Sequence, residues 1–409
     1  MTRLRLVLLA LALTSLPTPA HALDEFEVVA DGFGFAVNVA FAPDGTMYVA
    51  DKDRGQIRIV RDGELVPEPF AELPVLLTTN ETGLLGLALH PDFPSEPWVY
   101  AYFTDARDGF NRLVRIRAEG DTGTDVEVLL DLLPAPGFHN GGDMTFGPDG
   151  KLYLVTGDGT VPENAQDPES LGGKVLRLNP DGSIPDDNPF GPEDPVYALG
   201  IRNSFGLCVD PVTGELWETE NGPEEWDEIN LIRPGANYGW PLHLGPGEEP
   251  GFVAPVLAYR QPIVLTGCAG TPSNAGLYFG EGYAGNLHRM QIPGPGAIDR
   301  TPHDEIAARF EGGITDVAAT PDGTIWVVTP NAVFRSTQIL LPAPGPTFTD
   351  APGATGVTGR ETGATGATGL TASPSPAGRG DGGISAVGFV VLALLVGGLL
   401  LMRNRLLRR

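Results

Sequence analysis

The sequence predicts an all-β fold, a six-bladed β-propeller, on three observations. First, 55 of its 409 residues are glycine and 39 are proline, a turn-rich composition that favours many short strands over long helices. Second, a Pro-Asp-Gly turn followed by an alternating strand occurs at Pro43, Pro148 and Pro321. Third, looser copies fall between these, which gives a spacing of about 50 to 60 residues, typical of propeller blades.

Each copy has the chemistry of a β-hairpin, because proline pre-sets φ before the turn and glycine supplies a positive φ within it. We expect six blades centred on residues 35–62, 83–117, 139–178, 197–233, 270–292 and 312–337. The fifth lacks the turn and is predicted from Gly276-Leu-Tyr-Phe-Gly alone. The strand Phe26 to Val29 is expected to pair with the last blade and close the ring. A β-sandwich is the alternative that this patterning leaves open.

Both ends have the composition of targeting segments. Residues 1–22 are predicted to be a signal peptide, since two arginines precede an apolar run that ends in Ala-His-Ala. Residues 342–383, rich in Gly, Ala, Thr and Pro, are typical of a flexible stalk. Residues 384–402 carry no charge and predict one C-terminal transmembrane helix, and the basic tail 403–409 is expected in the cytoplasm. The propeller, residues 24–337, is then expected outside the cytoplasm, anchored to the membrane.

The net charge of the chain restricts the classes of molecule it can bind, and its cysteines bear on the redox state of its compartment. The net charge of −26 argues against a nucleic-acid partner, because phosphate backbones recruit clusters of Lys and Arg. The chain has two cysteines, Cys208 and Cys268. An oxidising compartment permits a disulfide between them, and two buried free thiols fit the sequence equally well.

A first polar loop contains His139, in the run His-Asn-Gly-Gly, and the strand that follows it ends in Thr-Gly-Asp158. Histidine acts as a base near neutral pH when a carboxylate orients its ring. Because the two residues flank one hairpin, their strands are expected to be adjacent. The residues alone favour a plainer interpretation, a loop histidine beside a turn aspartate.

Two further polar loops follow along the chain. Arg202 stands between glycines, where an arginine binds a ligand anion or forms a salt bridge with a neighbour. The third loop runs from Glu220 to Asn230 and continues to a segment that ends at Pro241. Its carboxylates and turn carbonyls suit a hard cation such as calcium, and a solvated acidic loop is the equal alternative. The sequence contains no Walker-type phosphate loop, zinc-spaced Cys/His cluster or Gly-x-Ser-x-Gly elbow.

These loops, in this order, resemble the soluble quinoprotein glucose dehydrogenases, also called glucose/sorbosone or aldose sugar dehydrogenases. The resemblance covers residues 33–337 and includes the runs from Glu81 to Phe93 and from Gly173 to Pro185. It implies a six-bladed propeller. It also implies oxidation of an aldose C1 hydroxyl to a lactone, with pyrroloquinoline quinone (PQQ) and calcium as cofactors and an electron acceptor that the sequence does not identify.

The resemblance also implies roles for individual residues. His139 corresponds to the general base, Asp158 to the carboxylate that orients it, and Arg202 to a residue that stabilises negative charge on the quinone. Glu81 and Asn203, with His139 and Arg202, would face the cofactor. The implied metal ligands are the carbonyls of Gly222 and Pro223 for the calcium of the cofactor, and Asp227, Glu228 and Tyr238 for a second, structural calcium.

The last blade departs from the family pattern. Where the family has two arginines that hold PQQ carboxylates, this chain has Gly313 and Thr315. Arg289 is the candidate for a compensating cation. The departure keeps two alternatives open: a calcium-stabilised propeller without enzyme activity that binds a glycan or protein at the cell surface, and an oxidoreductase with a different cofactor.

Overall fold

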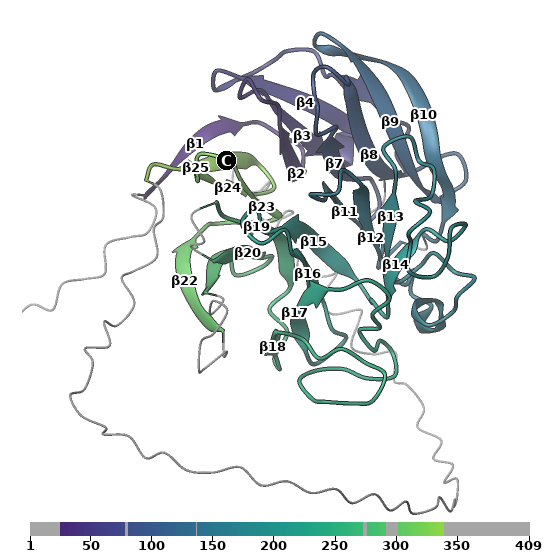
Figure 1. Cartoon of the computed structure of the whole chain (residues 1–409). Coiled ribbons are helices and arrows are strands. Elements are labelled where there is room, and N and C mark those ends of the chain that lie inside the picture. Colours follow the sequence, from purple (N-terminus) through teal and green to yellow (C-terminus); the bar gives the residue numbers. More distant parts are fainter. Residues whose placement is uncertain (1–24, 78–80, 136, 273–275, 292–301, 339–409) are drawn as a thin grey trace, which may run out of the picture. The chain divides into compact units, whose positions relative to one another are not determined.

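The computed structural model describes residues 25–77, 81–135, 137–272, 276–291 and 302–338. Within these ranges, six antiparallel sheets are arranged around a common centre (Figure 1). The strands β2, β7, β11, β15, β19 and β23 begin their sheets and lie nearest that centre. The prediction of an all-β, six-bladed propeller is therefore confirmed.

The first three blades follow one another along the chain. Blade 1 comprises β2 (Ala36–Phe41), β3 (Met47–Asp51), β4 (Gln56–Arg61) and β5 (Glu64–Leu65), and β6 (Ala71–Glu72) also pairs with β4. Blade 2 comprises β7 (Leu84–Leu89), β8 (Trp98–Thr104), β9 (Asn111–Glu119) and β10 (Thr122–Leu133). Blade 3 comprises β11 (Gly141–Phe146), β12 (Leu152–Thr156), β13 (Lys174–Leu178) and β14 (Val196–Leu199).

The other three blades complete the ring. Blade 4 comprises β15 (Ser204–Val209), β16 (Leu216–Glu220), β17 (Asp227–Ile232) and β18 (Leu257–Tyr259). Blade 5 comprises β19 (Leu265–Gly270), β20 (Leu277–Glu281), β21 (Asn286–Gln291) and β22 (His303–Arg309). Blade 6 comprises β23 (Asp316–Ala319), β24 (Ile325–Val328), β25 (Ala332–Ser336) and, from the other end of the chain, β1 (Phe26–Asp31).

The pairing of β1 with β25 closes the ring, as the sequence predicted. The two strands run antiparallel, with Phe26 opposite Ser336. The ring of Phe26 also packs edge-on against Phe310, with 5.1 Å between ring centroids. The N-terminal strand thus becomes the outer strand of blade 6, and backbone hydrogen bonds join the start of the chain to its last blade.

The expected ranges leave out the outer strands β10, β18 and β22, and two further blade boundaries differ from the prediction. Blade 5 begins at Leu265, five residues before the expected range 270–292, because all six residues of β19 are buried and the alternation that marks a half-buried strand is absent. The expected fourth blade began at residue 197, but β14 is the outer strand of blade 3. Only residues 200–203 separate β14 from β15 of blade 4, so the sequence shows no long break between the two blades.

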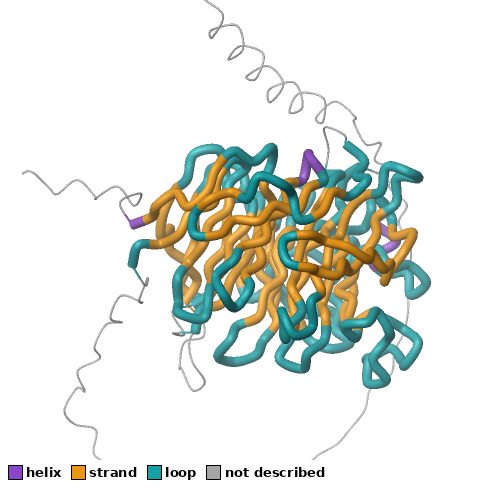
Figure 2. The backbone as a smooth tube through the Cα atoms, turned by 90° about the horizontal axis from the view of Figure 1, so that it is seen from above, coloured by secondary structure: helices purple, strands orange, loops and turns teal. Residues whose placement is uncertain are grey.

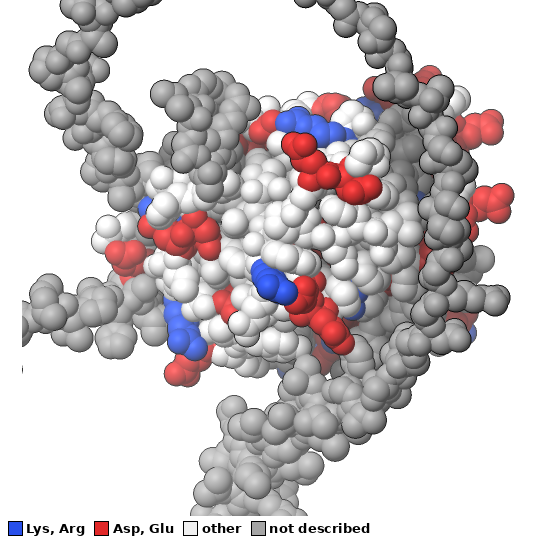
Figure 3. Space-filling view, turned by 90° about the horizontal axis from the view of Figure 1, so that it is seen from below, with Lys and Arg blue, Asp and Glu red and all other residues white. Residues whose placement is uncertain are grey.

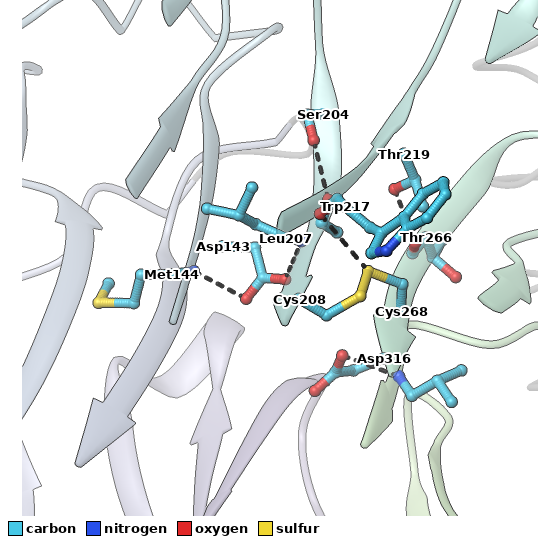
Figure 4. Close-up of a disulfide and its surroundings, with 12 residues drawn as sticks. Asp143, Met144, Ser204, Leu207, Cys208, Trp217, Thr219, Thr266, Cys268 and Asp316 are labelled. Carbon is cyan, nitrogen blue, oxygen red and sulfur yellow. Dashed lines mark hydrogen bonds between the residues drawn. A yellow bond between two sulfur atoms is a disulfide. The ribbon is translucent and has the colours of Figure 1, made fainter. Parts of the chain in front are cut away.

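The first strands approach one another closely around the centre of the ring. A Cβ atom on Gly86 of β7 would lie 2.1 Å from the carbonyl oxygen of Gly142, so glycine is required where blades 2 and 3 meet. Cys208 of β15 and Cys268 of β19 form a disulfide with a Cα–Cα distance of 5.7 Å (Figure 4). The alternative of two free thiols is thus excluded, and blades 4 and 5 are covalently joined.

The strands lie side by side around the ring, and the loops and short turns lie at its two faces (Figure 2). In Figure 3, most of the visible described surface belongs to uncharged residues, and the acidic and basic residues are scattered over it. The predicted signal peptide (1–22), stalk (342–383), transmembrane helix (384–402) and tail (403–409) lie outside the described residues. Among the residues that are described, no helix is long and apolar enough to cross a membrane.

Candidate active site

The polar loops picked out in the sequence meet at one face of the ring. In an antiparallel blade the loop before the first strand lies beside the end of the second strand. These loops therefore gather at one face, which we call the mouth. It is formed by loops 32–35, 52–55, 81–83, 137–140, 157–165, 200–203, 221–226 and 311–315, joined on the outside by the segment that contains Trp240.

His139 and Asp158 form a hydrogen-bonded pair at the mouth of blade 3. Nδ1 of His139 lies 2.7 Å from Oδ1 of Asp158, whose side chain is fully buried, whereas that of His139 is 17 % exposed. The same carboxylate accepts a hydrogen bond from the backbone N–H of Thr160 at 2.7 Å and, at Oδ2, from the indole N–H of Trp240 at 2.8 Å. With Nδ1 facing the carboxylate, Nε2 is the ring nitrogen left for chemistry.

The backbone beside His139 and Asp158 has an unusual conformation and a close approach between two segments. His139 has φ of 57°, in the left-handed region that residues other than glycine seldom adopt, and such strain is concentrated at functional sites. A Cβ atom on Gly157 would lie 2.0 Å from the carbonyl oxygen of His139, so only glycine permits the two segments to approach. The backbone of the two segments thus fixes the hydrogen-bonded pair in position.

Glu81 connects three blades. Its Oε2 accepts hydrogen bonds from the backbone N–H of His139 at 2.7 Å and from Nδ2 of Asn203 at 3.1 Å. Burial raises the pKa of the Glu81 carboxyl, and the nearby His139 together with these hydrogen bonds opposes the rise. Glu81 therefore holds both His139 and Asn203 in position, in addition to the cofactor contact that the family resemblance implied.

Arg202 is fixed over the start of the third polar loop. Its Nη1 donates to the carbonyl oxygens of Asn221 at 2.8 Å and Gly222 at 3.3 Å, and its guanidinium carbon lies 5.5 Å from the ring centre of Trp240. Its own carbonyl accepts a hydrogen bond from the N–H of Asp158 at 2.8 Å. Arg202, His139 and Asp158 thus belong to one connected unit.

Glu220, to which the sequence interpretation assigned no role, organises this loop. Its carboxylate accepts backbone N–H bonds from Arg202 and Asn203, each at 2.8 Å, and from Asn221 at 2.9 Å. Burial raises the pKa of Glu220 to about 8. Trp240 was also missed, although it stands in the run Asn-Tyr-Gly-Trp-Pro of the third polar loop. The sequence feature that could have indicated its role is an indole within a polar loop, because a buried Trp N–H usually donates to an acceptor nearby.

The predicted calcium ligands are only partly brought together. Both carboxylate oxygens of Asp227 accept backbone N–H bonds, Oδ1 from Gly222 at 2.9 Å and Oδ2 from Ile263 and Val264 at 2.8 and 2.7 Å. The Tyr238 hydroxyl donates to the carbonyl of Leu231 at 2.7 Å, so it is not an open ligand. Within the described ranges, no group of three or more His, Cys, Asp or Glu side chains is arranged to hold a metal ion.

A buried acidic face on blade 4 nevertheless suits a cation. Asn230 Nδ2 donates to Glu218 Oε2 at 3.1 Å and to Glu228 Oε2 at 3.4 Å. The buried Oε1 of Glu218 and Oδ1 of Asn230 have no hydrogen-bond partner in the described part of the chain. The pKa of the Glu218 carboxyl is raised, mainly by burial and to a smaller extent by the negative charge of the nearby Glu220. Oxygen atoms of this kind are the ligands that calcium prefers, so the donor set fits that ion.

The positions of the two missing arginines are closed by the backbone itself. Gly313 has φ of 87°, and a Cβ atom there would lie 1.8 Å from the carbonyl oxygen of Gly282, so no side chain fits. The backbone N–H and the hydroxyl of Thr315 both donate to the carbonyl of Val328. Arg289 does not compensate, because it lies in β21, the third strand of blade 5, and pairs with Glu305 of β22.

Comparison with known proteins identifies the family. The sequence model of the glucose/sorbosone dehydrogenase family matches residues 34–335. The chain belongs to this family. Its members are sugar dehydrogenases, and dehydrogenases are oxidoreductases. The chain is 28 % identical over 352 residues to the aldose sugar dehydrogenase YliI of Escherichia coli, an alignment that covers 78 % of this chain and 93 % of YliI.

Two solved structures show the same likeness in three dimensions. A candidate oxidoreductase (glucose dehydrogenase) from Thermus thermophilus is 41 % identical, with a TM-score of 0.71 over 76 % of this chain and 98 % of its own. The PQQ-bound aldose sugar dehydrogenase of Streptomyces coelicolor is 32 % identical, with a TM-score of 0.68 over 76 % of this chain and 97 % of its own. The family resemblance of the polar loops is therefore confirmed.

Proposed function

We propose that this protein is a PQQ- and calcium-dependent dehydrogenase that oxidises the C1 hydroxyl of an aldose to a lactone. The observation that carries the proposal is the pair His139 and Asp158, 2.7 Å apart at the mouth, with Arg202 linked to the same carboxylate segment. A base, its orienting carboxylate and a fixed cation are the groups that removal of a proton and a hydride from an alcohol requires.

Each of the polar residues at the mouth has a separate role in the proposed reaction. Nε2 of His139 takes the proton of the C1 hydroxyl, and Asp158 stabilises the imidazolium that results. Trp240 and Thr160 hold that carboxylate still through their N–H donors, so the ring of His139 keeps one orientation. Arg202 places positive charge beside the reacting groups. When bound, PQQ supplies the acceptor for the hydride that leaves C1.

The residues at the mouth fit a carbonyl- and carboxylate-bearing ligand in part. Arg202 and Asn203 would hold PQQ on blade 4, with Glu81 and His139 beside them on blades 2 and 3. The carbonyls of Gly222 and Pro223 would hold its calcium, which acts as a Lewis acid on a quinone. The second calcium would bind beside Glu228, where the orphaned oxygens of Glu218 and Asn230 lie. Asp227 and Tyr238 would then shape that site through their backbone contacts.

The location of the enzyme is also a proposal. The predicted signal peptide and C-terminal helix would place the propeller outside the cytoplasm, held at the membrane, and the disulfide between Cys208 and Cys268 favours an oxidising compartment. Electrons would leave through an acceptor outside the cytoplasm that the chain itself does not identify.

One reconstitution tests the proposal. The purified full chain is loaded with PQQ and calcium, and reduction of an acceptor dye is followed over a panel of aldoses while the lactone is quantified. We expect dye reduction that depends on both cofactors. Absence of activity with every sugar, together with no quinone absorbance retained by the protein after desalting, would show that the proposal is wrong.

The closed backbone at Gly313 favours a second candidate, a propeller without enzyme activity that binds a glycan or protein at the cell surface. In that case calcium alone would raise the melting temperature, and PQQ would add no further shift. A melting-temperature titration with PQQ at constant calcium therefore separates the two functions.

A further inference from the structure

The two positions of blade 6 where the family has arginines carry no cation here, and on the mouth side of blade 5 Arg309 of β22 donates to the carbonyl of Ala284. Gly313 has no space for a side chain, the hydroxyl of Thr315 is bonded to the backbone, and Arg289 is paired within blade 5. PQQ carries three carboxylates, and a carboxylate taken from water without a partner is strongly disfavoured. A mouth that holds such a ligand therefore needs another cation near blade 6.

Lys52 lies at the mouth of blade 1, which is the neighbour of blade 6 in the ring. It is the first residue of the short 3-10 helix η2 (Lys52–Arg54), directly after β3. Its backbone N–H donates to the carbonyl of Phe35 at 2.8 Å, and its ammonium lies 5.0 Å from the centre of the Phe35 ring. Phe35 directly precedes the central strand β2, so the ammonium of Lys52 lies near the end of that strand.

The stem of Lys52 is packed against the segment of blade 2 that carries Glu81. A Cβ atom on Gly83 would lie 2.7 Å from Cγ of Lys52, so the absence of a side chain at Gly83 makes room for the lysine. The side chain of Lys52 is only 12 % exposed. Its ammonium is consequently held near the mouth, beside the segment that begins at Glu81, and the side chain has little conformational freedom.

The partner of Lys52 differs from those of several other cations near the mouth. Arg54 pairs with the buried Asp51, Arg112 with the buried Asp105, and Arg202 with the carbonyls of Asn221 and Gly222. Arg260, which is itself exposed, pairs with the exposed Glu225. Lys52 pairs with its sequence neighbour Asp53 at 2.8 Å, and the side chain of Asp53 is 51 % exposed. An exposed ion pair of this kind is weak, so a ligand carboxylate competes with it readily.

We propose that Lys52 binds a carboxylate of the quinone cofactor and replaces, from blade 1, the charge that the family places on blade 6. The inference depends on the proposed function, because it assumes that a tricarboxylated quinone is the ligand. It assigns a cofactor-binding residue that no sequence pattern indicated. Lys52 touches the ligand through its ammonium, and Asp53 turns toward water when the ligand binds.

Binding is measured directly, without turnover. The full chain, in calcium, is titrated with PQQ, and Kd is obtained from quenching of tryptophan fluorescence for the wild type, Lys52→Gln, Lys52→Arg and Lys151→Gln. Lys151 is the matched control, because it lies in the turn between β11 and β12 on the opposite face and pairs with Asn179. Phenanthrenequinone, an ortho-quinone without carboxylates, serves as the second probe.

We expect Lys52→Gln to weaken PQQ binding by about 10- to 100-fold, the factor that corresponds to one charged hydrogen bond. Lys52→Arg should stay within about threefold of the wild type because it retains the charge. Lys151→Gln should have no effect, and the affinity for phenanthrenequinone should be equal in all four proteins. The melting temperature of each apo variant shows whether it folds.

Three different results would contradict the inference. If the wild type binds PQQ and Lys52→Gln binds it equally tightly, the role of Lys52 is wrong and the proposed function stands. If the wild type does not bind PQQ at all, the proposed function and the inference both fail. A loss of affinity for both quinones in folded Lys52→Gln would also overturn it, because the effect would then not depend on carboxylates.

Discussion

Nδ1 of His139 lies 2.7 Å from Oδ1 of Asp158, and the two residues belong to the two ends of one hairpin in blade 3. The carboxylate is fully buried and accepts two further N–H donors, so it is held in one orientation. A buried acceptor with this geometry fixes the tautomer of a histidine, which leaves Nε2 as an acceptor for a proton. The pair is the centre of the proposed catalytic site.

Replacement of Asp158 by Asn should remove catalysis while the cofactor still binds. An amide in place of the carboxylate no longer stabilises the imidazolium, so we expect kcat to fall by about 10²- to 10⁴-fold, the range of general acid–base catalysis. The measurement is steady-state dye reduction with the best aldose. Asp186→Asn, at an exposed position, is the matched control. A kcat within about threefold of the wild type in Asp158→Asn would contradict the assignment.

Replacement of Trp240 by Phe tests the positioning of Asp158. The indole N–H donates to Oδ2 of Asp158 at 2.8 Å, and phenylalanine keeps a ring against Arg202 but loses this donor. We expect kcat to fall about tenfold with little change in KM, since a hydrogen bond to a charged group is lost. Trp217→Phe is the control, because its buried indole nitrogen has no hydrogen-bond partner in the described residues. Equal kcat values for both variants would disprove the role of Trp240.

Calcium removal should destabilise the propeller. Chelation of an ion bound beside Glu228 would leave the buried carboxylate of Glu218 without compensation, so the melting temperature should drop on addition of EDTA and recover with calcium. Glu218→Gln should reduce the size of this calcium-dependent shift, whereas Glu193→Gln, at an exposed position, should not. Superimposable melting curves with and without chelator would exclude a structural calcium.

Loss of the disulfide should reduce stability without loss of the fold. Cys208 and Cys268 are 60 residues apart and join neighbouring blades, and the entropy of a loop of that length corresponds to about 4 kcal/mol. We expect the double variant Cys208→Ala/Cys268→Ala to unfold at lower denaturant concentration than the wild type. A reducing agent should lower the wild-type midpoint to that of the variant and leave the variant unchanged. A wild-type midpoint that is insensitive to reduction would contradict this expectation.

Stability should also fall as the pH rises toward neutrality. Asp143 and Asp316 meet near the centre of the ring, where Nδ2 of Asn38 donates to both, at 3.1 and 3.2 Å (Figure 4 shows the two aspartates). Burial raises the pKa of Asp143 to about 7, and burial together with the charge of Asp143 raises that of Asp316. In the unfolded chain an aspartate titrates near pH ~4. The folded state therefore binds more protons above that pH, and this stability is lost as the pH rises from about 4 to about 7.

The variant Asp143→Asn measures that contribution. It should be less stable than the wild type at pH 5, because the NH₂ group of an amide then faces one of the backbone N–H donors of Leu207 and Met144, which the two carboxyl oxygens accept at 2.7 and 2.9 Å. It should nevertheless lose less stability between pH 5 and pH 8. The slope of melting temperature against pH is the readout, with Asp186→Asn as the control. An unchanged slope in Asp143→Asn would show that Asp143 does not titrate in this range.

Local patterns were sufficient for much of the fold. The Pro-Asp-Gly turns at Pro43, Pro148 and Pro321 located three blades, because turn chemistry depends on adjacent residues. The limits of blade 5 were less accurate, since the continuous burial of β19 removes the alternation that marks a strand. The pairing of β1 with β25 was predicted from the need of a ring to close its last sheet.

The proximity of His139 and Asp158 was predictable for a similar reason: the two residues flank one hairpin, and the pairing of its strands brings them together. Trp240 lies 82 residues from the carboxylate it contacts, and Glu81 reaches Asn203 across 122 residues. No local pattern reports contacts of that separation.

The sequence by itself determined the repeat, the turn chemistry and the order of the polar loops, because these depend on neighbours along the chain. Only the tertiary structure decided that Cys208 and Cys268 are bonded and that a side chain at Gly313 would meet the carbonyl of Gly282. It also placed Lys52 beside the segment of Glu81. The physical reason is that these properties depend on how closely separate blades approach at the centre and the mouth of the ring, which is fixed when all six blades pack together.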